Sequence, residues 1–109
     1  MAQNYKVLGQ IAPSATTATT IYTVPSATEA VVSSVSVCDR AGTAATFRLS
    51  VRPDGASLAN QHYLVYDANL NANDTIIITI GVTMDATDVL EGYASSGDLT
   101  FHAYGSEIT

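Results

Sequence analysis

The side chains best able to carry out chemistry in this 109-residue chain are few and widely spaced. The two histidines, His62 and His102, each fall within a predicted strand, and no other histidine or cysteine lies close to either of them in the sequence. Structural zinc sites usually contain ligands paired at short spacing. We therefore predict no metal site and interpret both histidines as surface or partly buried side chains.

Two polar segments contain enough oxygen ligands to be considered as calcium loops. Residues 85–88 read Asp-Ala-Thr-Asp, and residues 71–74 read Asn-Ala-Asn-Asp. Neither segment has the alternating acidic ligands, the central glycine and the distal glutamate of a calcium-binding loop. Because Asp and Asn at such places commonly bond to their own backbone, we expect turns here.

No arrangement of residues indicates catalysis. The serines do not occur in a Gly-x-Ser-x-Gly motif, and no helix is predicted that could supply an oxyanion hole. Asp88 and Glu91 would lie on opposite faces of one strand, so they could not flank a glycosidic bond together. The sequence predicts a protein that is not an enzyme and needs no cofactor, with a small hydrolase built around His62 or His102 as the alternative.

Tyrosine is the most prominent aromatic residue, with six copies against two of phenylalanine and none of tryptophan. Tyrosines can form interface hot spots or sugar-binding platforms, or they can pack against a strand with the hydroxyl at the rim. The absence of tryptophan counts against a carbohydrate-binding face. The candidate interface residues are Tyr22, Tyr63, Tyr66, Tyr93 and Tyr104.

Charge is scarce and acidic on balance. Charged residues make up 13% of the chain, against about 25% in an ordinary soluble domain. The net charge of −6 and only four basic residues disfavour nucleic-acid binding, and no apolar run is long enough to cross a membrane. The first residues do not form a signal peptide, so we expect synthesis in the cytosol. The lone Cys38 cannot form an internal disulfide and is predicted to be a small core residue.

Apolar and polar residues alternate with the two-residue period of a half-buried strand. The clearest case places Phe47, Leu49 and Val51 on one face of residues 46–52. No segment has the periodicity of a helix. Strands are predicted at residues 5–10, 21–24, 29–38, 46–52, 62–67, 75–82, 88–95 and 99–104. This spacing favours a single domain, residues 1–109, folded as an antiparallel β-sandwich of about eight strands, with a jelly roll as one possible topology.

Two of these strands carry more detailed predictions. In residues 29–38 we place Val31, Ser33, Val35 and Val37 together on one face. Residues 75–82 form the most apolar strand, which we expect at the centre of a sheet. The chain has one lysine, the residue that commonly protects the outer strands of a sheet, so we expect neighbouring subunits to cover some edges.

Three stretches together resemble a known class of proteins: residues 21–25 (Ile-Tyr-Thr-Val-Pro) leading into 30–38, residues 59–64 (Ala-Asn-Gln-His-Tyr-Leu), and residues 101–108 (Phe-His-Ala-Tyr-Gly-Ser-Glu-Ile). Over most of its length the chain resembles small virion structural proteins of tailed bacteriophages, including phages of cyanobacteria. The resemblance implies a β-sandwich attached to the virion, with the major capsid protein or tail and neck subunits as partners.

The function predicted from these observations is that of a non-enzymatic virion protein. The first choice is a capsid decoration, or cement, protein that binds and stabilises the assembled particle and associates with copies of itself. One alternative is a small tail, neck or baseplate component. Another is a module that recognises a host-surface glycan through Tyr63, Tyr66 or Tyr93.

Overall fold

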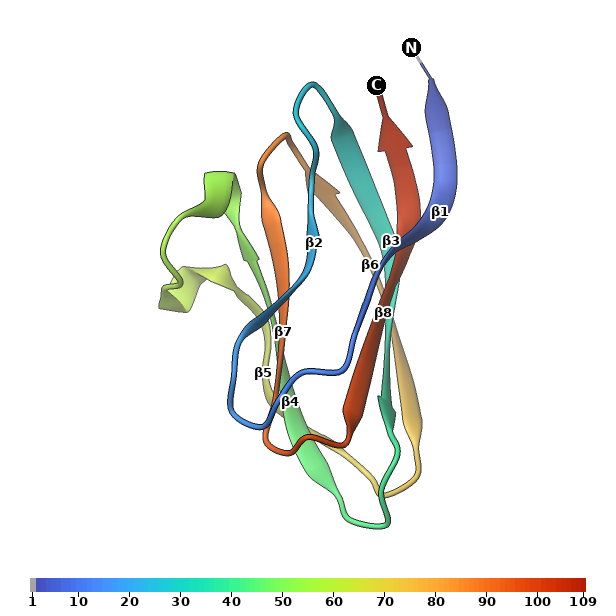
Figure 1. The fold of residues 1–109 in the computed structure, drawn as a ribbon, viewed down its shortest axis with the longest axis vertical. Helices are drawn as coiled ribbons and strands as arrows, with labels where there is room; N and C mark the ends of the chain where they lie inside the picture. Colours follow the sequence, from blue (N-terminus) through green and yellow to red (C-terminus); the bar gives the residue numbers. More distant parts are fainter. Residues whose placement is uncertain (1) are drawn as a thin grey trace.

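The computed structural model describes residues 2–109 as two four-stranded antiparallel sheets packed face to face (Figure 1). The strands are β1 (Gln3–Ile11), β2 (Thr19–Thr23), β3 (Glu29–Asp39), β4 (Ala45–Arg52), β5 (Tyr63–Leu70), β6 (Thr75–Met84), β7 (Val89–Ala94) and β8 (Leu99–Ile108). Two short 3₁₀ helices, η1 (Pro53–Gly55) and η2 (Asn60–His62), lie between β4 and β5. The predicted all-β sandwich of about eight strands is confirmed.

The strand order is that of a jelly roll. One sheet has the order β1-β8-β3-β6, and the other has the order β2-β7-β4-β5. The first strand pairs with the last, the second with the seventh, the third with the sixth and the fourth with the fifth. The chain is therefore one long hairpin wrapped into two layers, which is the double-sheet arrangement of jelly rolls.

The core lies between the inner faces of the two sheets. Phe47 of β4 meets Phe101 of β8 edge to face, with ring centroids 6.2 Å apart and the ring planes at 71°. Both rings are almost completely buried, as is Leu49, so the alternation predicted for residues 46–52 is confirmed. Burial of side chains of this size stabilises a fold by about 1.5–3 kcal/mol each.

The face assignment predicted for residues 29–38 is wrong in the first half of the strand. Val32 is fully buried and Ser33 is exposed, whereas Val35 and Val37 are buried as predicted. The pairing of β3 with both neighbours shifts register between Val32 and Ser34. At this bulge two consecutive residues, Ser33 and Ser34, point to the outer side. The inward-facing residues therefore change from even-numbered to odd-numbered positions.

The most apolar strand, β6, lies at the edge of its sheet and not at the centre as predicted. It pairs with β3 alone. Ile77 is 67% exposed and Ile76 is 38% exposed. A high content of apolar residues predicts a central strand only if the sandwich buries all of them. This sandwich leaves part of β6 exposed.

Several strand limits differ from the predicted ones. β8 continues to Ile108, because its last residues pair with both β1 and β3. β5 begins at Tyr63 and ends at Leu70, so His62 lies in η2 and not in a strand. Cys38 lies on the half-exposed outer face of β3 and is not a core residue. No helix among residues 2–109 is long and apolar enough to cross a membrane.

Close approach of the backbone makes glycine necessary at two positions. A Cβ atom added to Gly105 of β8 would lie 1.9 Å from the carbonyl oxygen of Val31, on the neighbouring strand. A Cβ atom added to Gly9 would lie 2.0 Å from the carbonyl oxygen of Ile21, where β1 passes β2. Because both obstacles are backbone atoms, neither could move without disturbing a strand.

We predict that Gly105→Ala destabilises the protein by about 1–3 kcal/mol or more, because the added methyl group displaces β3. Gly42→Ala is the matched control, since no atom lies within 4 Å of its added Cβ. Urea unfolding of the two variants measures the difference. Equal midpoints for the two variants would contradict the packing of β8 against β3 described above.

Candidate binding surfaces

Three of the predicted interface tyrosines lie near one arginine on the outer face of the β2-β7-β4-β5 sheet, and two of them contact it. The Arg48 guanidinium carbon lies 4.1 Å from the ring centroid of Tyr66 and 4.3 Å from that of Tyr93. The Tyr63 ring meets Tyr66 edge to face, with centroids 4.8 Å apart. We call Arg48, Tyr63, Tyr66, Asp67 and Tyr93 the arginine–tyrosine cluster.

Strand register explains why these residues meet. Tyr93 of β7 is the direct partner of Arg48 on β4. On the other side, the register between β4 and β5 shifts, so that Tyr66 and Asp67 together lie opposite Arg48. Asp67 adopts a φ of 52°, a conformation that aspartate tolerates better than most residues. One bulge therefore presents an aromatic ring and a carboxylate to the same cation.

The cation is also paired with the carboxylate. Arg48 Nε donates to Asp67 Oδ1 at 2.7 Å, and Arg48 Nη2 donates to Asp67 Oδ2 at 3.2 Å. These hydrogen bonds hold the pKa of Asp67 below its usual range and raise that of Arg48. Arg48 is held in place by its hydrogen bonds to Asp67 and by the two rings that flank it. Together, Arg48 and these rings form an ordered surface.

A shallow depression adjoins the cluster. Asn60, Tyr63 and Tyr66 line about 290 Å³ of space beside η2. Tyr66 is 59% exposed, whereas Tyr63 is half-buried. The rings of Tyr63 and Tyr66 stand at 84° to each other and do not form a flat platform. Stacking of a sugar ring on Tyr66 would be confined to the part of that ring that Arg48 leaves free.

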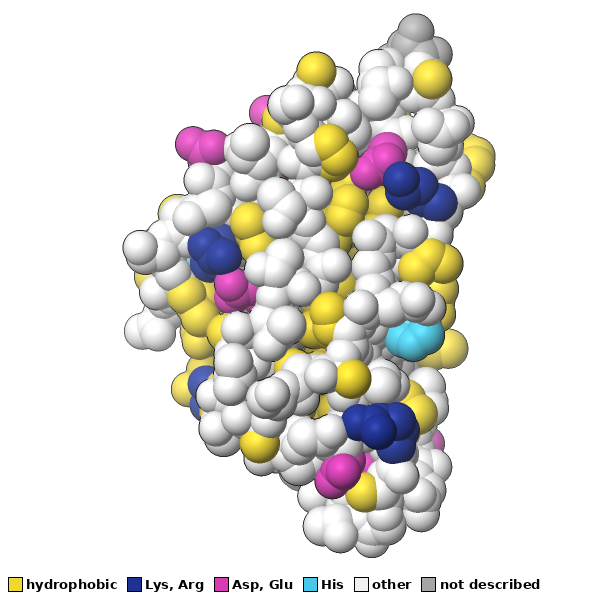
Figure 2. All heavy atoms as spheres, in the orientation of Figure 1, with side chains coloured by type: hydrophobic (Ala, Val, Ile, Leu, Met, Phe, Trp, Pro, Cys, Tyr) yellow, Lys and Arg dark blue, Asp and Glu magenta, His cyan; other side chains and the backbone are white. Residues whose placement is uncertain are grey.

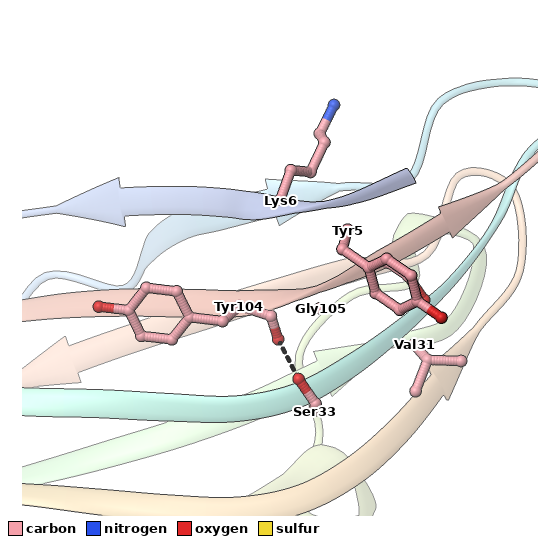
Figure 3. Close-up of a pocket in the computed structure, with 7 residues that line it drawn as sticks. Tyr5, Lys6, Val31, Ser33, Tyr104 and Gly105 are labelled. Carbon is pink, nitrogen blue, oxygen red and sulfur yellow. Dashed lines mark hydrogen bonds between the residues drawn. The ribbon is translucent and has the colours of Figure 1, made fainter. Parts of the chain in front are cut away.

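The opposite sheet has a second depression, of about 390 Å³. In Figure 3 the Tyr5 ring lies over the sheet near Val31, and the Ser33 hydroxyl donates to the carbonyl oxygen of Tyr104 at 3.1 Å. Tyr5 is 81% exposed, the largest value among the exposed large hydrophobic residues. Tyr5 is not among the interface residues predicted from the sequence, although its place in the first predicted strand was an available signal.

Tyr104 and His102 are neighbours on the same outer face. The Tyr104 hydroxyl and Nδ1 of His102 lie 3.1 Å apart, and the Gln10 amide nitrogen lies 3.3 Å from the same ring nitrogen. His62 is far away in the fold, in η2 beside the other sheet, where its Nδ1 accepts from the backbone N–H of Ala59. The structure therefore does not bring the two histidines together.

Tyr22 lies in the interior, so it leaves the set of candidate interface residues. It is 8% exposed, and its hydroxyl donates to Oε2 of Glu107. Glu107 is also 8% exposed and forms an ion pair with Lys6, with Nζ and Oε1 2.8 Å apart. Burial, followed by the hydrogen bond to Glu107, raises the pKa of Tyr22. The ion pair with Lys6 and the hydrogen bond from Tyr22 lower the pKa of Glu107.

The acidic turns bind backbone, as the turn interpretation predicts. One oxygen of Asp88 accepts from the N–H of Asp54 and the other accepts from the N–H of Asp85. Asp74 accepts from the N–H of Thr75. Residues 2–109 contain no group of three or more His, Cys, Asp or Glu side chains arranged to hold a metal ion.

Charged groups are few on the surface. On the face that Figure 2 shows, a few blue patches lie beside magenta ones, and the rest of the surface is mostly white and yellow. The outward positions on the central part of the β8-β3-β6 face include no Asp, Glu, Lys or Arg; they are Thr100, His102, Tyr104, Ser34, Ser36, Cys38, Thr75, Ile77 and Thr79. A face of this kind loses little hydration free energy when another surface covers it.

Neither a search of known protein families nor a search of curated proteins finds a match to this sequence.

The buried Glu107 predicts a specific dependence of stability on pH. Because its pKa is lower in the folded state, its contribution is present above the unfolded-state value of 4.5 and is lost as the pH falls through the folded-state pKa. Glu107→Gln should therefore lower the free energy of unfolding at neutral pH and flatten its decline in acid. Denaturant unfolding across the acid range, with the exposed Glu29→Gln as control, measures this. Parallel profiles for wild type and Glu107→Gln would contradict the assignment.

The hydrogen bond from Tyr22 can be tested separately. Tyr22→Phe removes the hydroxyl and leaves the ring in the core, so we expect a loss of about 1.5–3 kcal/mol, the range for a hydrogen bond to a charged group. Thermal and urea unfolding give the value. Tyr5→Phe, which changes an exposed hydroxyl, should have almost no effect, and an equal effect of both substitutions would argue against the buried bond.

Proposed function

We propose that this protein is a non-enzymatic structural component of a tailed-bacteriophage particle, a capsid decoration protein that binds and stabilises the assembled shell. The observation that carries the proposal is the arginine–tyrosine cluster, an ordered and partly exposed group of the residue types enriched in interface hot spots. The resemblance to small virion proteins supplies the class of particle. The partners would be the major capsid protein and further copies of this chain.

The rest of the surface supports a docking role over an enzymatic one. His102 lies on β8 and His62 lies in η2 beside the other sheet, and the Nδ1 atom of each ring takes part in a hydrogen bond. Both oxygens of Asp88 accept from backbone N–H groups, and Oε1 of Glu91 forms an ion pair with Arg52 at 2.7 Å. A jelly roll with these side chains already in use offers surfaces and not a reactive cleft.

A decoration protein acts by mass action. If it binds the assembled shell and not its dissociated subunits, each bound copy favours the assembled state. An interface of ordinary size, about 1,600 Å² in total, with the cluster at its centre would be sufficient for a specific contact.

The proposal predicts that the chain is present in purified particles, with cryo-electron microscopy density on the outside of the capsid. Mass spectrometry measures its copy number relative to the major capsid protein. A small number of copies located on the tail, neck or baseplate would favour that alternative. Absence of the polypeptide from the particle would overturn the virion role.

The role of the cluster is tested by adding purified variants to particles that lack the protein. Arg48→Ala and Tyr66→Ala should each weaken binding at least about tenfold, because alanine substitution at a hot spot costs about 2 kcal/mol or more. Leu58→Ala is the control, an exposed apolar residue outside the cluster. Equal binding by all three variants would remove the cluster from the interface.

The depression beside Tyr63 and Tyr66 favours a second candidate, recognition of a host glycan. Glycan-array binding that is lost in Tyr63→Ala and Tyr66→Ala, with particle binding unchanged, would support it. Particle binding lost in the same variants, without glycan binding by the wild type, would support the decoration role instead.

A further inference from the structure

The four edge strands of the sandwich differ in how they are protected. β1 carries Lys6 and lies against β2, and β2 is only five residues long with a register shift. β5 has two register shifts and carries Asp67 of the Arg48 ion pair. Such charges, bulges and short lengths are the usual means of preventing sheets from joining edge to edge.

β6 has little of this protection. It runs for ten residues, Thr75–Met84, without a charged residue or a proline. Its one irregularity, where Gly81 adopts a φ of 60°, lies near its end and leaves Thr75–Thr79 in regular pairing with β3. A regular, uncharged and apolar edge with free backbone donors and acceptors can pair with another strand.

The side chains of β6 also lack cover. Ile77, on the outer face, is 67% exposed. Its inward neighbour Ile78 is only partly buried, whereas Val35 of β3, directly opposite Ile78, is completely buried. The core is thus closed at β3 and left partly open at β6.

We propose that this protein forms a twofold-symmetric dimer in which β6 pairs antiparallel with β6 of a second copy about Ile77. The β1-β8-β3-β6 sheet of one copy and the same sheet of the second copy then become one continuous sheet of eight strands. This inference identifies the partner in the self-association that the proposed function includes, and it rests on that function for its biological role only.

The register about Ile77 follows from pairing the regular part of the strand with itself. Ile77 meets Ile77 of the second copy, Ile76 meets Ile78, and Thr75 meets Thr79. Inward-facing residues meet inward-facing residues, and outward-facing residues meet outward-facing ones, as a two-residue period requires. The most exposed residue of the strand becomes covered on the symmetry axis.

Charge favours the same register and the same partner. Asp74 and Asp85 flank the strand at its two ends. An axis at Thr79 would place Asp74 opposite Met84 and so beside Asp85 of the second copy, whereas the axis at Ile77 places it opposite Ile80. A protein with a net charge of −6 meets its own copy here without opposing carboxylates, and a strongly charged partner would find no counter-charge on β6.

The first test is the oligomeric state in solution, measured by light scattering and sedimentation over a wide concentration range. We expect a dimer for the wild type and for Leu64→Lys, which adds a charge to an exposed residue on the β5 edge. Ile77→Lys should raise the dissociation constant at least about tenfold, because two lysines then face each other. Mixing Ile77→Lys with Ile77→Glu should restore a dimer, which excludes misfolding as the cause.

The register is tested by crosslinking in a Cys38→Ser background. Ile77→Cys places two thiols on the axis, where directly paired strand residues have Cα atoms about 4.5–5.5 Å apart, within the range of a disulfide. Thr79→Cys is the matched control, because its copies lie on opposite sides of the axis and should remain reduced. Crosslinking of Thr79→Cys but not of Ile77→Cys would overturn the register.

A wild type that stays monomeric at the highest concentrations, or that forms open fibres, would overturn the closed dimer. So would a dimer that Leu64→Lys disrupts and Ile77→Lys does not. None of these results decides whether the chain binds particles, which is measured separately. Conversely, a dimer about Ile77 in a protein that is absent from particles would retain this inference and overturn the proposed function.

Discussion

Contact between the inner faces of the two sheets is the interaction on which the rest of this structure depends. Phe47 from β4 and Phe101 from β8 meet at its centre, and completely buried valines and leucines from both sheets surround them. The bulge in β3 preserves this layer, because without it either Val32 or the pair Val35 and Val37 would point outward. The outer faces can carry tyrosine, threonine and serine freely because this inner layer supplies most of the apolar burial.

The four basic side chains are all engaged within the chain. Lys6, Arg48 and Arg52 each form an ion pair, with Glu107, Asp67 and Glu91 respectively, and Arg40 donates to the carbonyl oxygen of Gly97 at 2.8 Å. Two of the carboxylates, Glu91 and Glu107, are buried at 8% exposure, where an unpaired charge would be costly. Lys6 and Arg52 therefore compensate the charge of buried acids, and Arg48 holds the arginine–tyrosine cluster together. None lies on β6 to keep other strands from pairing with it.

These two features together relate the fold to the proposed roles. One face of each sheet packs in the core. The outer face of the β2-β7-β4-β5 sheet presents the arginine–tyrosine cluster, and the central part of the outer β8-β3-β6 face has no Asp, Glu, Lys or Arg. A single domain of this kind can contact a shell with one sheet and a second copy with the edge of the other. The jelly-roll topology places these two surfaces on different sheets, so the two contacts do not compete for the same residues.

Alternation of apolar and polar residues with a two-residue period predicts an all-β sandwich from the sequence alone, because this alternation is a local property of the order of residues. The sequence also indicated Tyr63, Tyr66, Tyr93 and Tyr104 as candidate interface residues. The structure places these four on the outer faces, whereas Tyr22, from the same set, is buried. Three features could not be predicted without the three-dimensional fold: Tyr22 is buried against Glu107, β6 lies at an edge, and Arg48 lies between two rings. Each of these depends on which strands pair and where the register shifts. Pairing and register are set by contacts between residues distant in the sequence, and a local period is the same for an edge strand and a central one.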